Sequence, residues 1–167
     1  MLEVGSIIKP GNFGRVIECY RSNNMGPMTV RELTFEIARL KNFADRPSRF
    51  KSVFLFPTLG HAMAHLQRFD VSSLIYEVEL TEPDEGVFHG DMGLVHFGVP
   101  NEHMPVIPFL YQLASQYWLG IDSIQPESEL LTMSPIRIVA FHDHRIPPEQ
   151  YEQAIAEAKA ASNQQLG

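Results

Sequence analysis

Two glutamates, Glu127 and Glu129, are the residues of this sequence whose spacing is best suited to chemistry. They flank Ser128 and lead directly into the apolar residues 130–131. At strand spacing both side chains project to the same side, so they can act on one substrate from adjacent positions. Two close carboxylates raise one of the two pKa values, which permits different roles. On spacing alone, however, a Glu-x-Glu pair is more typical of a solvated strand edge.

The seven histidines suggest a metal site as an alternative. His61 and His65 are four positions apart on an expected helix and so share one face, as in zinc proteases. The residue that follows His61 is alanine, where a zinc protease has the glutamate that acts as its base. The segment 142–144 (His-Asp-His) follows the end of a strand, where such residues are commonly solvated. We therefore expect no metal site.

Nucleophilic catalysis has little support in the sequence. Cys19 is the only cysteine, which excludes an internal disulfide and a four-cysteine zinc site, and we expect it to be buried in a strand. No Gly-x-Ser-x-Gly elbow is present, and Ser52 precedes its strand instead of following it. A Ser-His-Asp hydrolase is therefore not expected.

Length, composition and charge favour one soluble domain. The chain has 167 residues, with 44% hydrophobic and 20% charged residues, and we assign residues 1–161 to a single domain and 162–167 to a frayed tail. A net charge of −7 disfavours bulk nucleic-acid binding. Basic residues nevertheless gather between Arg39 and Lys51, which indicates a local positive groove. Neither a signal peptide nor a membrane helix is recognisable, so we expect a cytoplasmic protein, acting in its own cell or in the cytoplasm of a host or target cell.

The apolar spacing and the turn residues predict the elements of the fold. Thr29 and Glu32 form the pattern of a capping box that begins a helix, along which Val30, Leu33, Ile37, Leu40 and Phe43 form one apolar stripe. The other expected helices cover 58–69, 105–120 and 148–161. The expected strands include two across 7–17 separated by a glycine turn, then 52–56, 73–80, 92–97, and a pair at 129–132 and 136–141 joined by a tight turn.

This order indicates an α+β fold with a mainly antiparallel sheet. Helices and strands do not alternate regularly, and no Gly-x-Gly-x-x-Gly follows a strand. A doubly wound nucleotide-binding fold is therefore excluded.

The order of several segments resembles the ADP-ribosyltransferase superfamily, in particular its small bacterial members. The Glu-x-Glu at 127–129, its apolar strand, the turn and the second strand at 136–139 resemble the closing segment of these enzymes. Residues 52–56, 58–66 and 74–78 are similar to the middle portion of the family, where a serine-led strand and a helix precede a strand with tyrosine. Residues 2–11, which end in Pro-Gly, look like the opening of members that modify rifamycin antibiotics.

This resemblance implies a cleft between two small, mainly antiparallel sheets with flanking helices, in which NAD would bind as co-substrate. Glu129 would hydrogen-bond the nicotinamide ribose and stabilise the cationic sugar as nicotinamide leaves, and Glu127 would orient or deprotonate the acceptor. Phe54 would stack on the nicotinamide. The remaining cofactor-binding residues implied by the resemblance are Arg15 or Arg49, as alternatives for the family's arginine or histidine, and Ser48 and Ser52.

Three functions follow, in decreasing order of preference. The first is an NAD-dependent mono-ADP-ribosyltransferase, of the toxin or effector type, whose acceptor is a protein or a small molecule. The second is a non-enzymatic interaction protein that keeps the fold but has lost the first catalytic position. The third, a nucleic-acid-modifying enzyme, is disfavoured by the charge.

Overall fold

The computed structural model describes residues 2–19, 26–69, 74–96, 103–124 and 126–143. Its helices are α1 Asn12–Glu18, α2 Gly26–Asn42, α3 Leu59–Phe69, α4 Met92–Val95 and α5 Val106–Leu119, with 3-10 turns η1 Arg49–Lys51 and η2 Pro83–Glu85. Its strands are β1 Ile7–Ile8, β2 Val53–Leu55, β3 Leu74–Leu80, β4 Phe88–Asp91, β5 Ser128–Thr132 and β6 Ile136–Asp143. The predicted helix at 148–161 and the frayed tail lie outside the described residues.

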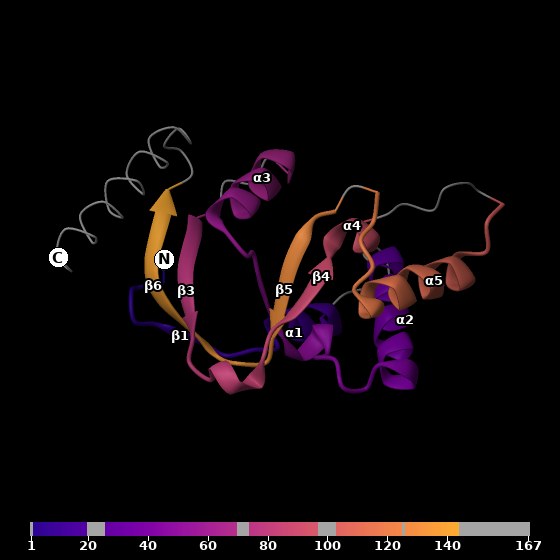
Figure 1. Cartoon of the computed structure of the whole chain (residues 1–167), viewed down its shortest axis with the longest axis horizontal. Coiled ribbons are helices and arrows are strands. Elements are labelled where there is room, and N and C mark those ends of the chain that lie inside the picture. The colour runs from indigo at the N-terminus through magenta and orange to yellow at the C-terminus, as the bar shows by residue number, and fades with distance from the viewer. Residues whose placement is uncertain (1, 20–25, 70–73, 97–102, 125, 144–167) are drawn as a thin grey trace.

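The strands form two small antiparallel sheets, which confirms the α+β prediction. One sheet has the order β1-β6-β3 and the other β2-β5-β4. The first lies to the left in Figure 1, the second lies in the middle, and α2 and α5 lie to the right. No helix in the described part of the chain is both long and apolar enough to cross a membrane.

The main apolar core lies where α2 and α5 pack together and against the β2-β5-β4 sheet. Trp118 and Tyr117 of α5 and Phe35 of α2 are completely buried, and the indole Nε1 of Trp118 donates to the backbone oxygen of Phe35 at 2.9 Å. Phe88 and Leu131 bring β4 and β5 into the same cluster.

β5 and β6 are strands as predicted, but they do not pair with each other. β5 pairs with β2 and β4, whereas β6 pairs with β1 and β3. The link between them is anchored by Ser134, which is fully buried: its amide donates to Thr132 Oγ1, and its hydroxyl accepts from the amide of Glu82. These bonds satisfy the amide and the hydroxyl of Ser134 where the chain crosses from one sheet to the other.

Two other predicted strands are wrong. Residues 12–18 form α1, which follows Gly11 in the left-handed conformation at φ 90°, and Cys19 ends it as an exposed residue. Residues 92–95 form α4, because the carboxylate of Asp91 accepts from the amide of Gly93 and caps a helix there. The preceding residues 88–91 form β4, which their mixed composition did not indicate.

The orientation of α2 differs most from what its sequence pattern suggests. The helix already includes Gly26, so Thr29 lies inside it and forms no capping box with Glu32. Glu32 and Arg39 are buried, whereas Leu33 and Ile37 of the apolar stripe are 47% and 58% exposed. A single apolar stripe ordinarily faces the core, but here the inward face carries Glu32 and Arg39 beside Phe35 and Ala38.

Gly14 allows α1 to lie directly on η1, which carries one of the candidate site residues. A Cβ at Gly14 would lie 2.4 Å from the backbone oxygen of Phe50, whereas one at Gly60 of α3 would come no closer than 3.6 Å, to Thr58 Oγ1. We expect Gly14→Ala to destabilise the fold by about 1–3 kcal/mol through overpacking. The matched Gly60→Ala should change stability by less than about 1 kcal/mol.

Urea denaturation of both variants measures the difference. An unchanged midpoint for Gly14→Ala would contradict the close packing of α1 on η1.

Candidate functional site

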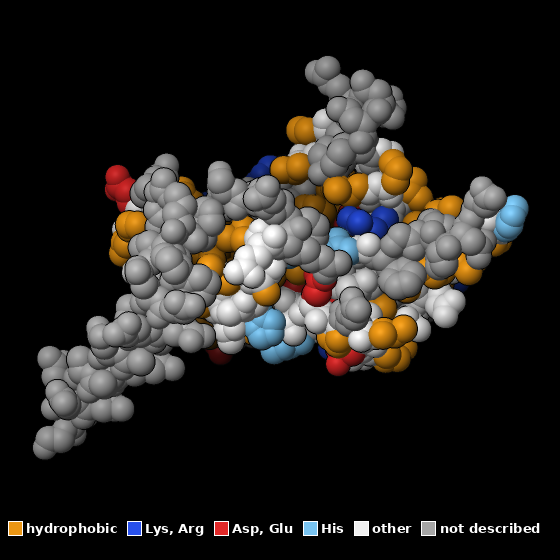
Figure 2. Space-filling view, turned by 90° about the horizontal axis from the view of Figure 1, so that it is seen from above, with side chains coloured by type: hydrophobic (Ala, Val, Ile, Leu, Met, Phe, Trp, Pro, Cys, Tyr) orange, Lys and Arg blue, Asp and Glu red, His pale blue; other side chains and the backbone are white. Residues whose placement is uncertain are grey.

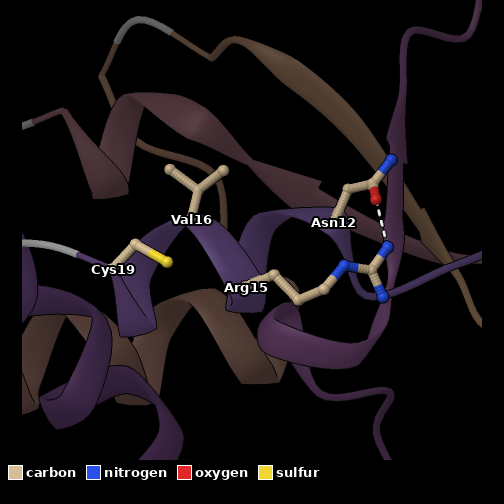
Figure 3. A pocket seen from close by; sticks show the side chains of 4 residues that line it. All are labelled: Asn12, Arg15, Val16 and Cys19. Atoms are coloured by element: carbon tan, nitrogen blue, oxygen red, sulfur yellow. Dashed lines mark hydrogen bonds between the residues drawn. The ribbon is translucent and has the colours of Figure 1, made fainter.

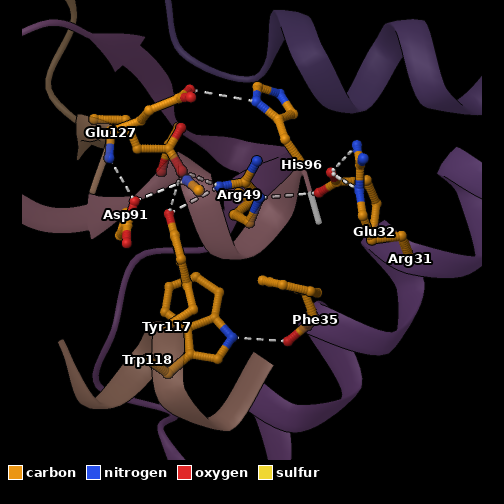
Figure 4. A network of polar contacts seen from close by, with 12 residues as sticks. Arg31, Glu32, Phe35, Arg49, Asp91, His96, Tyr117, Trp118 and Glu127 are labelled. Carbon is orange, nitrogen blue, oxygen red and sulfur yellow. Dashed lines mark hydrogen bonds and ion pairs between the residues drawn. The ribbon is translucent and has the colours of Figure 1, made fainter. Parts of the chain in front are cut away.

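The candidate site is built around Arg49, whose guanidinium group is buried between two carboxylates. Arg49 Nε donates to Glu32 at 2.9 Å, and Nη1 donates to Glu129 Oε1 at 2.5 Å and to the hydroxyl of Tyr117 at 2.8 Å. The Tyr117 hydroxyl itself donates to the same Glu129 oxygen at 2.8 Å. Figure 4 shows Glu32, Arg49 and Tyr117 converging from α2, η1 and α5.

All four members of this network are withdrawn from solvent. Arg49 is 5% exposed, Glu129 is 2% exposed, Glu32 is 1% exposed, and Tyr117 is completely buried. Arg31, at the margin of this network, forms a second ion pair with Glu32, with 3.0 Å between Arg31 Nη2 and Glu32 Oε1. The two cations therefore balance the two carboxylates, which is the condition for burying this many charges.

Burial and neighbouring charge together shift the pKa values of Arg49 and Tyr117. Burial alone would lower the pKa of Arg49, but Tyr117, Glu129 and Glu32 raise that pKa well above its ordinary value. Burial raises the pKa of Tyr117 well above its ordinary value; the charge of Arg49 opposes this rise, while Glu129 adds to it. Arg49 is therefore a cation, and Tyr117 is a neutral hydroxyl that donates to Glu129.

Aromatic rings enclose the guanidinium group of Arg49. Its central carbon lies 4.8 Å from the ring centroid of Phe54, 5.1 Å from that of Tyr117 and 6.0 Å from that of Phe35. Phe54 in turn meets Phe13 of α1 edge to face at 5.0 Å. The predicted cofactor residue Phe54 thus lies beside Arg49 and contributes a cation–π contact to it.

Glu127 lies at a more open edge of the same region. Its carboxylate is 3.6 Å from His96 Nδ1, with side-chain exposures of 21% for Glu127 and 29% for His96. The ring of His96 stacks near that of His65 at 6.3 Å. Glu127 and Glu129 therefore have different partners, one near the surface and one buried. In Figure 2, acidic, histidine and basic side chains reach the surface near the middle of the face shown.

Asp91 fixes the backbone on which Glu127 is carried. Its carboxylate accepts from the amides of Glu127 at 2.7 Å and Ser123 at 2.6 Å, as well as from Gly93. The amide of Met92 donates to the carbonyl of Glu127 at 2.7 Å. Asp91 is only 4% exposed, so this buried carboxylate, capping a helix, also holds the segment that leads into β5.

The two predicted serines support the Arg49 segment and donate to groups other than Glu129. Ser52 Oγ donates to the carbonyl of Ser48 at 2.8 Å, and Ser48 Oγ donates to Glu36 at 3.1 Å. Glu36 is itself held by Arg39 through two hydrogen bonds. These contacts fix η1 to α2 at a second point beside the Arg49 network.

Arg15 lies on a different surface. Its guanidinium group hydrogen-bonds the side chain of Asn12, and both residues line a shallow pocket on α1 with Val16 and Cys19 (Figure 3). Of the two alternatives for the family's arginine, Arg49 is the one in contact with Glu129. Among the described residues, no group of three or more His, Cys, Asp or Glu is placed to hold a metal ion.

Sequence reasoning missed Glu32, Asp91 and Tyr117 as partners of the site, and it missed Gly90. Gly90 pairs with Glu129 across β4 and β5, and a Cβ there would lie 2.6 Å from the Tyr117 hydroxyl. A glycine at this position therefore admits the Tyr117 ring to the network. The one available signal was the pair of polar residues, Glu32 and Arg39, facing away from the apolar stripe of their helix.

Removing the charge of Arg49 should destabilise the protein strongly. Arg49→Met leaves two buried carboxylates facing each other, and we expect a loss of about 3–5 kcal/mol. Tyr117→Phe removes one hydroxyl and should cost about 1–2 kcal/mol. The matched control is Arg137→Met, whose ion pair with Glu79 is about half exposed, and it should cost less than about 1 kcal/mol.

Chemical denaturation ranks the three variants. Equal losses for Arg49→Met and Arg137→Met would show that the network contributes no more than a surface ion pair.

The raised pKa of Tyr117 should appear as alkaline sensitivity. The unfolded chain releases the tyrosine proton near pH 10, whereas the folded chain retains it to higher pH. The stabilisation is therefore complete below about pH 10 and is lost as the pH rises through the folded pKa. The difference in unfolding free energy between the wild type and Tyr117→Phe should fall above about pH 10. A constant difference from pH 8 to 11 would contradict this.

Comparison with known proteins assigns the chain to a family. Residues 7–151 match the family described as "Protein of unknown function (DUF2441)". The match covers most of the chain, so the protein belongs to this family. The comparison with curated proteins finds no relative.

Proposed function

For this member of the DUF2441 family, we propose an NAD-dependent mono-ADP-ribosyltransferase activity in which Glu129 is the catalytic carboxylate. The observation that supports the proposal is the direct contact of Arg49 with Glu129 at 2.5 Å. It joins two residues that the resemblance placed in one active site, although they are far apart in the sequence. The two small antiparallel sheets are compatible with the fold expected of an ADP-ribosyltransferase.

The proposed reaction needs a fixed negative charge beside the ribose of NAD. The bond between ribose C1′ and the nicotinamide nitrogen breaks, and its electron pair leaves with nicotinamide. The positive charge that develops on the ribose is stabilised by Glu129, whose position is set by Arg49 and Tyr117. Preorganised charge of this kind is worth several kcal/mol in a site that excludes water.

The remaining roles follow from exposure and contact. Glu127 is the more accessible carboxylate and is the proposed base that takes the proton of the acceptor nucleophile as it bonds to C1′. Arg49 is buried and already bound to two carboxylates and one hydroxyl, so we assign it to positioning Glu129 rather than to binding the phosphates of NAD. Ser48 and Ser52 brace η1, and nicotinamide stacking on Phe54 stays a prediction.

Release of nicotinamide from NAD tests the proposal. We expect Glu129→Gln to lower the rate about 10²–10³-fold, the usual effect of removing one group that stabilises transition-state charge. Glu127→Gln should retain hydrolysis of NAD but lower transfer to an acceptor in a lysate, measured by mass spectrometry. Glu85→Gln, an exposed change on η2, is the matched control and should have wild-type activity.

Circular dichroism establishes that each variant is folded, because Glu129 is buried. If the wild type neither releases nicotinamide nor binds millimolar NAD in calorimetry, the proposed activity is wrong. Equal rates for the wild type and folded Glu129→Gln would show that another group carries the chemistry.

The low exposure of Glu129 favours a second candidate, a non-enzymatic interaction protein on the same fold. A carboxylate that is 2% exposed and already bound by Arg49 and Tyr117 can serve a purely structural role. The acidic chain would then suit a basic partner. Calorimetry with NAD distinguishes the two, because only the enzyme has to bind it.

A further inference from the structure

The outward face of α2 is a continuous apolar surface. Val30, Leu33, Ile37 and Leu40, here called the α2 seam, are 39%, 47%, 58% and 61% exposed. The other exposed side chains of this helix are Pro27 at its start and Lys41 and Asn42 at its end. A soluble helix normally carries charged or polar residues on such a face, so the α2 seam has the composition of an interface.

The spacing of the α2 seam is that of a coiled-coil contact. Its four members follow one another at intervals of three, four and three residues, which is the a/d pattern of two heptads. This pattern makes a narrow line of side chains that fits a second line of the same kind. A second copy of the chain presents the identical line, and a two-fold axis brings the two together with the same patch on each side.

The α2 seam cannot turn inward, because the opposite face of α2 is fixed. Glu32 is paired with Arg49, and Phe35 is buried against α5 and hydrogen-bonded by Trp118. Rotating the helix would break the charge network and the core at once. Rotation of α2 therefore cannot bury the apolar seam, which has to be covered by a group that packs on it.

The charges of α2 also permit two copies to meet. The chain has a net charge of −7, which would ordinarily make copies repel each other. The side chain of Glu32 is fully buried, and that of Glu36 is 15% exposed and paired with Arg39. No carboxylate of α2 therefore stands on the seam, and the acidic excess lies elsewhere on the protein.

We propose that the protein forms a homodimer in which the α2 seams of two copies pack against each other around a two-fold axis. Two heptads make an interface below the size of a standard permanent complex, so the dimer should dissociate in the micromolar range. The dimer would cover the face of α2 opposite Glu32 and is independent of any reaction with NAD.

Molecular mass in solution tests the proposal. In sedimentation or light scattering, the wild-type chain should shift from monomer to dimer between about 1 and 200 µM. Leu33→Glu with Ile37→Glu places two charges on each seam and should leave a monomer throughout that range. The matched control, Val4→Glu with Ile124→Glu, changes two residues that are exposed elsewhere, and it should dimerise like the wild type.

The charged substitutions lie at exposed positions, so circular dichroism and the urea midpoint at low concentration should match those of the wild-type monomer. A wild type that stays monomeric at 200 µM would overturn the proposal, even if it then bound a different protein through α2. A dimer that persists in the Leu33→Glu, Ile37→Glu variant would also overturn it, because the contact would lie elsewhere.

Discussion

The burial of one arginine constrains much of this structure. A guanidinium group withdrawn from water must be met by negative charge and by hydrogen-bond acceptors, or the cost exceeds the stability of a small domain. Arg49 donates hydrogen bonds to Glu32, Glu129 and Tyr117, which lie on three other elements. The one group therefore fixes the positions of α2, η1, α5 and β5 relative to one another. The inward charged face of α2 and the small residue at Gly90 both serve this arrangement.

The same arrangement has two consequences for function. It holds Glu129 in one position, and it also leaves that carboxylate little exposed. Glu127, fixed through its backbone by Asp91 and paired with His96, is the accessible member of the pair. Turning the charged face of α2 inward also exposes its apolar residues. The buried network and the α2 seam thus have one physical origin.

Sequence patterns predicted the elements whose stability is local. The helix at 106–119 and the strands at 74–80 and 128–132 were found because apolar spacing and turn residues specify them. The incorrect predictions concern segments whose structure depends on contacts with residues far away in the sequence. Asp91, whose carboxylate also binds the distant amides of Ser123 and Glu127, caps a helix where apolar residues suggested a strand. The crossover at Ser134 separates two strands for which the sequence predicted a hairpin. Glu32 matched a helix cap, but its partner lies 17 residues further along the chain.

The sequence by itself determined the α+β class and the apolar stripe of α2, and its segment order placed Glu129 and Arg49 in one site, with Arg15 as the alternative to Arg49. It did so because composition, periodicity and order are properties of the chain alone. Only the tertiary structure decided that these two residues are in contact, that Tyr117 and Glu32 complete their network, and that the stripe faces outward. Electrostatic pairing in a buried site depends on distances between groups up to 80 residues apart, and no local pattern records such distances.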